Sequence, residues 1–239
     1  LRRMATITSP QNEKLKLIRR LGRRRARERE GLFVGEGEDL LAAARAAGAE
    51  PVELLTAAGE GLGGTEVEPA LLARVSKLGS GTRAIGVWRE LWADQAIPPC
   101  VYLHGVSDPG NVGTVIRTAN ALVGGSVVLG PDCADPYGAH AVRATMGAVF
   151  AQPLLRGDID TTPAPRAALV VHGGEPLEAL DEVATVCLGA EREGLPAATV
   201  EHCDIQVTIP LREGAESLNV AAAAAIALQR IASAAGEHA

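Results

Sequence analysis

Aromatic residues are scarce in this chain, which has only two Phe, two Trp and two Tyr among its 239 residues. Domains that hold single-stranded nucleic acid on a stacking platform depend on exposed aromatic rings, so an RRM or an OB fold is not indicated. Apolar burial must come from Ala, Val, Leu and Ile instead. The length allows one large domain or two small ones, each with a real core.

Metal-binding and membrane patterns are also missing. The four cysteines, Cys100, Cys133, Cys187 and Cys203, form no Cys-x-x-Cys pair, and no histidine cluster accompanies them. We therefore expect no zinc site and no metal requirement. No apolar run is long enough to span a membrane, and no signal peptide is visible. Free thiols are typical of a reducing compartment, so we predict a cytoplasmic protein without a membrane partner.

Common nucleotide-binding and hydrolase signatures are absent as well. The sequence contains neither a Gly-x-Gly-x-x-Gly fingerprint nor a Walker loop, which argues against the ordinary nucleotide-binding folds. Its five histidines are scattered, and no Ser-His-Asp arrangement is evident.

Charge is present but unevenly distributed. Residues 1–30 hold eleven Lys or Arg against three Glu, whereas the remaining residues hold twelve basic and 26 acidic groups. A basic segment on an acidic body suggests contact with RNA phosphates, although a solvated amphipathic helix would show the same pattern. The candidate RNA-binding residues in this segment are Arg19, Arg20, Arg23, Arg24 and Arg25.

Hydrophobic patterning divides the chain into four parts. Residues 1–30 form a basic helix or arm, with a helix predicted from Ser9-Pro10 through residue 30. Strands alternate with helices over residues 31–92, which predicts a small α/β domain. Residues 93–99 end in Ile97-Pro98-Pro99, as a linker does. Residues 100–239 form a second α/β region.

Three loops rich in Gly, Asn and Ser carry the candidate chemistry. They cover residues 108–119 (DPGNVGTVIRTA), 188–195 (LGAEREGL) and 209–220 (IPLREGAESLNV), and each flanks a predicted strand of the second region. The strands are apolar without clean alternation, which predicts a parallel sheet covered on both faces. Ligands bind at the carboxyl ends of such strands, so the three loops are expected to line one pocket.

The same three segments resemble, in order and in separation, the signature motifs of the SpoU (TrmH-like) family of RNA 2′-O-ribose methyltransferases, within the SPOUT superfamily. The match covers roughly residues 100–232, and residues 140–148 (HAVRATMGA) resemble a further stretch of that family. Residues 33–37 resemble the substrate-binding domain found in many members. In two places the chain departs from the family pattern: at Arg192, where Gly is common, and at Leu211-Arg212.

The resemblance implies a C-terminal trefoil-knot methyltransferase domain, S-adenosylmethionine (AdoMet) as the methyl donor, and a homodimer. It gives catalytic roles to Arg117, Asn111, Glu191, Ser217 and Asn219. It places the cofactor at Gly189, Ile209 and Leu218, with Val171 and Gly194 in the same cleft. Arg143 joins the predicted RNA-binding residues.

Each catalytic candidate also has an ordinary structural interpretation. Asn111 can cap the helix that follows it, and Ser217 or Asn219 can cap the last helix. Arg117 can be a surface charge, and Glu191 an acidic residue at a helix start. If Arg117 is catalytic, the resemblance allows two roles: it takes the hydroxyl proton as a base, or it orients the ribose and stabilises the developing alkoxide. We favour the second role, because deprotonating a guanidinium is costly.

The favoured function is methylation of a ribose 2′-hydroxyl in structured RNA, with ribosomal RNA preferred to transfer RNA because of the separate substrate domain. One alternative is a transfer RNA 2′-O-methyltransferase. The other is a knotted RNA-binding or assembly factor without catalysis, which would not require all five catalytic candidates.

Overall fold

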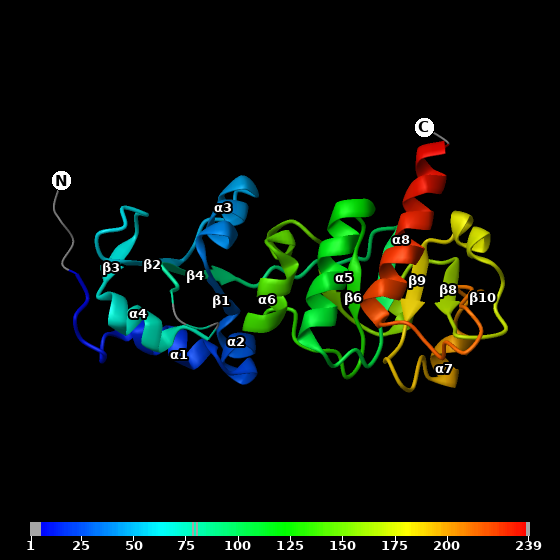
Figure 1. Ribbon diagram of the computed structural model, residues 1–239, viewed down its shortest axis with the longest axis horizontal. Helices are drawn as coiled ribbons and strands as arrows, with labels where there is room; N and C mark the ends of the chain where they lie inside the picture. Colours follow the sequence, from blue (N-terminus) through cyan, green and yellow to red (C-terminus); the bar gives the residue numbers. More distant parts are fainter. Residues whose placement is uncertain (1–5, 78, 80, 238–239) are drawn as a thin grey trace. The chain divides into compact units, whose positions relative to one another are not determined.

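A computed structural model of the chain describes residues 6–77, 79 and 81–237 (Figure 1). Its contacts divide it into two units. The first comprises residues up to Glu90 together with Asp135–Phe150, and the second comprises Leu91–Ala134 and the residues from Ala151 onward. Each unit has its own β-sheet. The domain boundaries given above remain predictions.

The first unit is a four-stranded sheet with helices packed against it. Its strands lie in the order β1-β4-β2-β3, in which only β2 and β3 are parallel. In chain order its elements are α1 (Glu13–Leu21), α2 (Arg24–Glu30), β1 (Leu32–Glu36), α3 (Glu38–Ala46), β2 (Glu53–Ala57), β3 (Thr65–Val67), α4 (Pro69–Val75), β4 (Ala84–Arg89), α6 (Ala139–Thr145) and the 3-10 turn η1 (Ala148–Phe150).

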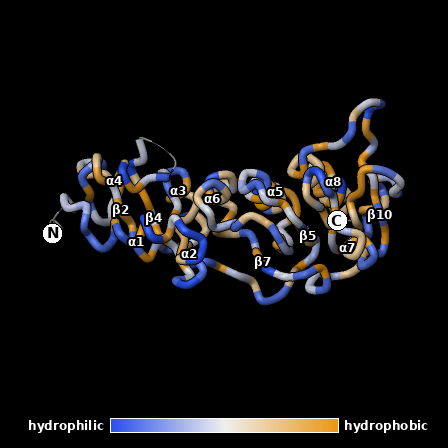
Figure 2. Tube along the Cα trace, turned by 90° about the horizontal axis from the view of Figure 1, so that it is seen from below, coloured by the Kyte–Doolittle hydropathy of each residue, from blue (hydrophilic) through white to orange (hydrophobic). Residues whose placement is uncertain are grey.

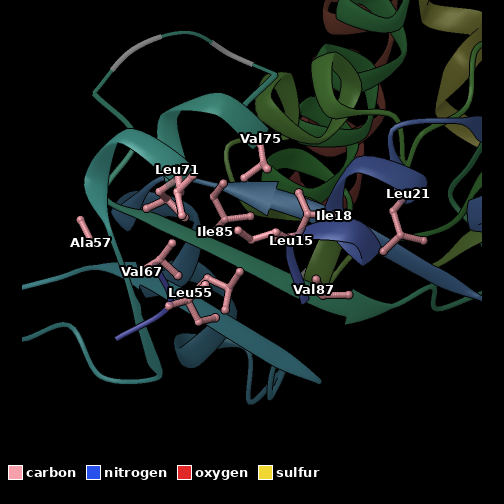
Figure 3. Close-up of a cluster of buried hydrophobic side chains, with 12 residues drawn as sticks. Leu15, Ile18, Leu21, Leu55, Ala57, Val67, Leu71, Val75, Ile85 and Val87 are labelled. Atoms are coloured by element: carbon pink, nitrogen blue, oxygen red, sulfur yellow. The ribbon is translucent and has the colours of Figure 1, made fainter. Parts of the chain in front are cut away.

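The basic N-terminal segment contains two helices, so the single helix predicted for residues 9–30 is wrong. α1 begins after Asn12, whose side chain caps it, and ends at Gly22. One face of α1 is buried because its apolar residues recur at helical spacing. The buried residues of α1 are Leu15, Ile18 and Leu21. Figure 3 shows them in a cluster with side chains of β2, α4 and β4. Figure 2 shows that α2, by contrast, is hydrophilic.

Residues 135–150 belong to the first unit because two sets of contacts hold them there. The rings of Phe33 and Tyr137 lie 4.8 Å apart, and those of Trp88 and Phe150 lie 5.0 Å apart. Four of the six aromatic side chains are therefore in one cluster. In addition, the buried guanidinium of Arg27 donates to the carboxylate of Asp135 over 2.6 Å. Removing one partner of such a buried pair typically costs about 3–5 kcal/mol, because the other charge is then buried without compensation.

The second unit contains a six-stranded sheet in the order β10-β8-β9-β5-β6-β7, in which every pairing is parallel. This confirms the predicted parallel α/β fold. In chain order its elements are β5 (Cys100–Leu103), α5 (Pro109–Leu122), β6 (Val127–Leu129), β7 (Leu154–Arg156), η2 (Ile159–Thr161), β8 (Arg166–Leu169), η3 (Leu177–Glu182), β9 (Thr185–Leu188), α7 (Ala197–Glu201), β10 (Ile205–Val207) and α8 (Val220–Glu237).

The two faces of this sheet are covered differently. α5 and α8 pack side by side over one face (Figure 1). The other face carries an apolar cluster that includes Tyr102, Leu155 and Ile159, with Ala93 and Ala96 packed against it. Because all the strands are parallel, the loops after β5, β8, β9 and β10 leave from the same edge of the sheet. Within the part of the chain that is described, no helix is both long enough and apolar enough to cross a membrane.

Candidate active site

The start of α5 is capped by Asp108, and this leaves Asn111 available for another role. The Asp108 carboxylate accepts a hydrogen bond of 2.8 Å from the backbone N–H of Asn111. Pro109 occupies the first turn, where the absence of an N–H does no harm. The capping interpretation of Asn111 is therefore wrong, because its side chain lies in the first turn and points to other partners.

Asn111, Glu191 and Asn219, one from each motif, form a closed hydrogen-bonded triangle. The Nδ2 group of Asn219 donates to Oδ1 of Asn111 over 3.1 Å and to Oε1 of Glu191 over 3.1 Å. The Nδ2 group of Asn111 donates to the same oxygen of Glu191. These contacts hold the loops after β9 and β10 against the start of α5. One carboxylate oxygen thus takes both amide donors, which leaves the other oxygen of Glu191 for a further partner.

Asn219 also caps α8, so its structural and functional interpretations hold together. Its Oδ1 atom accepts hydrogen bonds from the backbone N–H groups of Ala221 (2.9 Å) and Ala222 (3.3 Å). The amide oxygen thus fixes the helix, while the amide nitrogen serves the triangle. An aspartate in this position would cap equally well but would have no N–H to donate.

A cavity of about 460 Å³ opens beside the triangle at the carboxyl ends of β8 and β9. Glu191 lines it, and so does Ser217. Every residue predicted to bind the cofactor also lines it. These residues are Val171, Gly189, Gly194, Ile209 and Leu218. The walls are largely apolar, and Val171 and Leu218 remain partly exposed there, as expected of a surface that a ligand covers.

The turn of the second motif depends on two glycines. A Cβ atom on Gly189 would lie 2.0 Å from the carbonyl carbon of Gly194, so no larger residue fits without moving the turn. Gly194 has a φ of 68°, in the left-handed region, and its N–H donates to Ala190 over 2.8 Å. Arg192 stands between them and is not among the described residues with positive φ. The departure from the family's Gly is therefore compatible with this turn.

Among the described residues, no hydrogen bond or ion pair joins Arg117 to the other catalytic candidates. It lies on the exposed surface of α5, and within the described residues its guanidinium has no hydrogen bond or ion pair. Thr114 and Thr118 on the same helix each donate to a backbone carbonyl four residues earlier. An exposed arginine without a partner retains all its donors for a ligand.

The predicted RNA-binding arginines fall into two groups. Arg20 donates to Glu30 over 2.7 Å, Arg24 to Glu28 over 2.9 Å, and Arg19 to the carbonyl of Pro10 over 2.8 Å. The second group has no ion pair or hydrogen bond from the side chain in the described part of the chain, and all its members are exposed. It consists of Arg23, Arg25 and Arg143.

Sequence reasoning missed other residues that line the cavity. They include Leu169, Leu188, Leu211, Glu216 and Val220. Leu169 and Leu188 are the last residues of β8 and β9. Because ligands bind at the carboxyl ends of parallel strands, this position could have identified both residues from the sequence. No group of three or more His, Cys, Asp or Glu among the described residues is arranged to hold a metal ion. The absence of a metal requirement remains a prediction.

Two cysteines, Cys187 and Cys203, belong to the apolar cluster that contains Tyr102. Cys187 immediately precedes Leu188 on β9, and Cys203 precedes β10. The Cys187 thiol donates to the sulfur of Cys203, which raises the pKa of Cys187, as does burial. The same hydrogen bond lowers the pKa of Cys203, and the charge of Arg166 adds to this effect.

The chain is similar to known methyltransferases. It is 36% identical over 133 residues to the 23S rRNA (guanosine(2553)-2′-O)-methyltransferase RlmP of Bacillus subtilis, covering 52% of this chain and 54% of the relative. The chain thus spans about half the length of that relative. It is 30% identical over 253 residues to an uncharacterized tRNA/rRNA methyltransferase of Synechocystis, covering 94% and 92%.

Solved structures agree over nearly the whole chain. The AdoMet-bound rRNA methyltransferase of Sinorhizobium meliloti superposes with a TM-score of 0.82 at 26% identity, covering 95% of this chain and 97% of that one. The MRM3-like substrate binding domain matches residues 12–90. The SpoU rRNA Methylase family matches residues 98–229, which include all three motifs. The expected relationship is confirmed, and the chain belongs to the SpoU rRNA Methylase family.

Proposed function

We propose that the chain transfers a methyl group from AdoMet to a ribose 2′-hydroxyl of ribosomal RNA. The observation that carries this proposal is the triangle of Asn111, Glu191 and Asn219 beside the cavity. Asp108 alone caps α5, and the side-chain oxygen of Asn219 caps α8. The other hydrogen bonds of the triangle are not needed for capping, so they serve to position the two loops. Membership of the SpoU family supports the same activity.

The residues of the cavity fit AdoMet. A volume of about 460 Å³ is in the range of small-molecule and cofactor sites. Val171, Ile209 and Leu218 offer apolar surface for the adenine and the thioether, and the close Gly189–Gly194 turn offers backbone groups. When bound, AdoMet supplies an electrophilic methyl group. The rRNA methyltransferase of Sinorhizobium meliloti is described as AdoMet-bound, which supports the assignment.

In this proposal Arg117 acts on the ribose. The triangle has a different task, which is to hold the loops after β9 and β10 in place. A ribose hydroxyl is a weak nucleophile and must lose its proton as it attacks. A guanidinium stays protonated in proteins, so Arg117 stabilises the developing alkoxide and orients a neighbouring phosphate. A phosphate oxygen of the substrate then accepts the proton. The unpaired, exposed state of Arg117 supports this role, because its donors are not already engaged.

Ribosomal RNA is the favoured substrate. Relatives named as 23S rRNA 2′-O-methyltransferases and the match to a substrate-binding domain both support it. Transfer RNA methylation and a non-catalytic role in RNA binding remain alternatives. The location proposed for this activity is the cytoplasm. We also keep the trefoil knot and the independence from metal as parts of the proposal.

A homodimer completes the proposal. α5 and α8 lie side by side and present Leu122 (39% exposed) and Ile226 (38% exposed). A second copy packed on this surface would cover both side chains. Leu122→Glu with Ile226→Glu is expected to halve the mass seen by light scattering. A purely monomeric wild type with full activity at micromolar concentration contradicts the dimer.

Mapping ribose methylation tests the activity itself. Total RNA from cells with and without this protein is compared nucleotide by nucleotide. The proposal expects one ribose in ribosomal RNA to lose its methyl group, and re-expression of the chain to restore it in the presence of a chelator. Loss of methylation only in transfer RNA favours the first alternative, and no change at any ribose favours the non-catalytic one.

A further inference from the structure

The first unit contains a second pocket, of about 260 Å³, which lies between α6 and the turn from β1 to α3. We name it the α6 pocket. Its walls combine apolar and polar side chains. The apolar ones are Val34, Leu40, Val142 and Met146, and the polar ones are Glu36, Asp39 and Arg143. All of these residues belong to the first unit.

Two of the polar side chains are free to bind a ligand. Asp39 and Arg143 are exposed, and in the described part of the chain neither side chain has a hydrogen bond or an ion pair. Glu36 is different, because its carboxylate accepts hydrogen bonds from the Ser76 hydroxyl (2.5 Å) and the backbone N–H of Lys77 (2.7 Å). The pocket therefore offers one free carboxylate and one free guanidinium that do not neutralise each other.

Met146 lies at the rim of the α6 pocket in an unusual backbone conformation. Its φ is 49°, a left-handed value that few residues other than Gly adopt, and 56% of its surface is exposed. This conformation ends α6, because Met146 is the left-handed C-cap of that helix and its backbone N–H donates to the carbonyl of Arg143. A flexible thioether chain adapts well to a flat apolar ligand. Val142 on the preceding turn and Leu40 on α3 are buried and provide a rigid floor.

We propose that the α6 pocket binds an unpaired guanine base of the RNA substrate; this inference rests on the proposed function of the chain. A phosphate is excluded as the main occupant because Asp39 and Glu36 would repel it. A guanine presents two adjacent N–H donors on its Watson–Crick edge, which match the carboxylate of Asp39. Its O6 and N7 atoms accept the fork of Arg143, the commonest arginine–base contact. The apolar side chains pack on its faces.

The other bases fit less well. Adenine turns the lone pair of N1 toward Asp39 and an amino group toward Arg143, so both polar contacts become unfavourable. Uracil has a single N–H donor and a smaller face. Good bidentate pairs discriminate between bases by about ten- to a hundredfold in affinity, and this is the scale expected here.

RNA pentamers test the inference without knowledge of the natural substrate. The full chain, saturated with AdoMet, is titrated with fluorescent UUGUU, UUAUU and UUIUU, in which inosine lacks the 2-amino group. We expect UUGUU to bind about tenfold or more tightly than UUAUU, with inosine in between. A fourth pentamer with 7-deazaguanine removes N7 and is expected to weaken binding in the wild type but not in Arg143→Gln.

Variants localise the preference. Asp39→Asn and Arg143→Gln are expected to abolish it, whereas the exposed, unpaired residues changed in Glu50→Gln and Arg74→Gln serve as matched controls in the same unit. Equal binding of all pentamers by the wild type overturns the inference, and so does a guanine preference that survives in both pocket variants. Neither result affects ribose methylation, which is scored separately on ribosomal RNA. If Asp39→Asn does not fold, the inosine and 7-deazaguanine comparisons in the wild type and Arg143→Gln decide.

Discussion

Asn219 donates a hydrogen bond of 3.1 Å to Asn111, although 108 residues separate them in the chain. The same amide nitrogen also donates to Glu191, so the start of α8, the loop after β9 and the start of α5 meet at one point. Because this amide oxygen caps α8, one residue performs two tasks that mutagenesis can separate.

Asn219→Ser separates them. Serine caps a helix about as well as asparagine, so the free energy of unfolding should change by less than about 0.5 kcal/mol. Its side chain is too short to reach both partners, so methyl transfer should fall about tenfold to a hundredfold through lost positioning. Asn219→Ala should lose activity similarly and also about 1 kcal/mol of stability. Urea unfolding and methyl transfer measure the two effects. A Ser variant with wild-type activity would show that the triangle is only structural.

Gly189→Ala should weaken AdoMet binding. The added Cβ atom would lie 2.0 Å from a backbone carbon of Gly194, so the turn that borders the cavity must move. We expect the affinity for AdoMet, measured by calorimetry, to fall by about tenfold or more. Gly236→Ala is the matched control, since nothing lies within 4 Å of its added Cβ atom. Equal AdoMet affinity in both variants would place the cofactor elsewhere.

Reversing Arg19, Arg20, Arg23, Arg24 and Arg25 to Glu should weaken RNA binding and leave AdoMet affinity intact. Within this set, Arg23 and Arg25 should matter most, because Arg20 and Arg24 already pair with Glu30 and Glu28. Each lost phosphate contact should reduce the slope of log affinity against log salt by about 1. Arg23→Gln with Arg25→Gln is compared with Arg20→Gln with Arg24→Gln. An unchanged slope in the fivefold variant would mean that this segment does not touch RNA.

Cys203 should be the most readily alkylated thiol of the four. Its pKa is lowered by the hydrogen bond from Cys187, and a thiolate is the reactive form, so its reaction with iodoacetamide should begin at lower pH than in the urea-unfolded chain. Cys187→Ala removes the donor and should move the pH profile of Cys203 upward. Peptide mass spectrometry measures the rates. A profile unaffected by Cys187→Ala would contradict the assigned hydrogen bond.

Much of the second unit was predictable because its pattern is local. Apolar runs of parallel strands and glycine-rich loops after them are visible without any partner, so the common pocket followed from topology. The triangle was not derivable from the residues alone, because Asn111 and Asn219 both look like helix caps. Only the position of Asp108 one turn earlier shows that Asn111 is not needed as a cap.

Features that depend on distant partners were missed. Residues 135–150 join the first unit through contacts such as Phe33–Tyr137 and Arg27–Asp135, which no local pattern reveals. The end of α1 at Gly22 was not predicted, because basic residues continue on both sides of this glycine.

The most direct test of the account is single-turnover transfer of labelled methyl to ribosomal RNA by Arg117→Ala and Arg117→Lys, with AdoMet affinity measured in parallel. We expect both variants to bind AdoMet normally, because Arg117 does not line the cavity. Arg117→Ala should lose about two to three orders of magnitude in rate, or about 3–4 kcal/mol, as for a key electrostatic group. Arg117→Lys should also be badly impaired because lysine lacks the planar fork. Near wild-type transfer by Arg117→Ala would contradict the catalytic assignment.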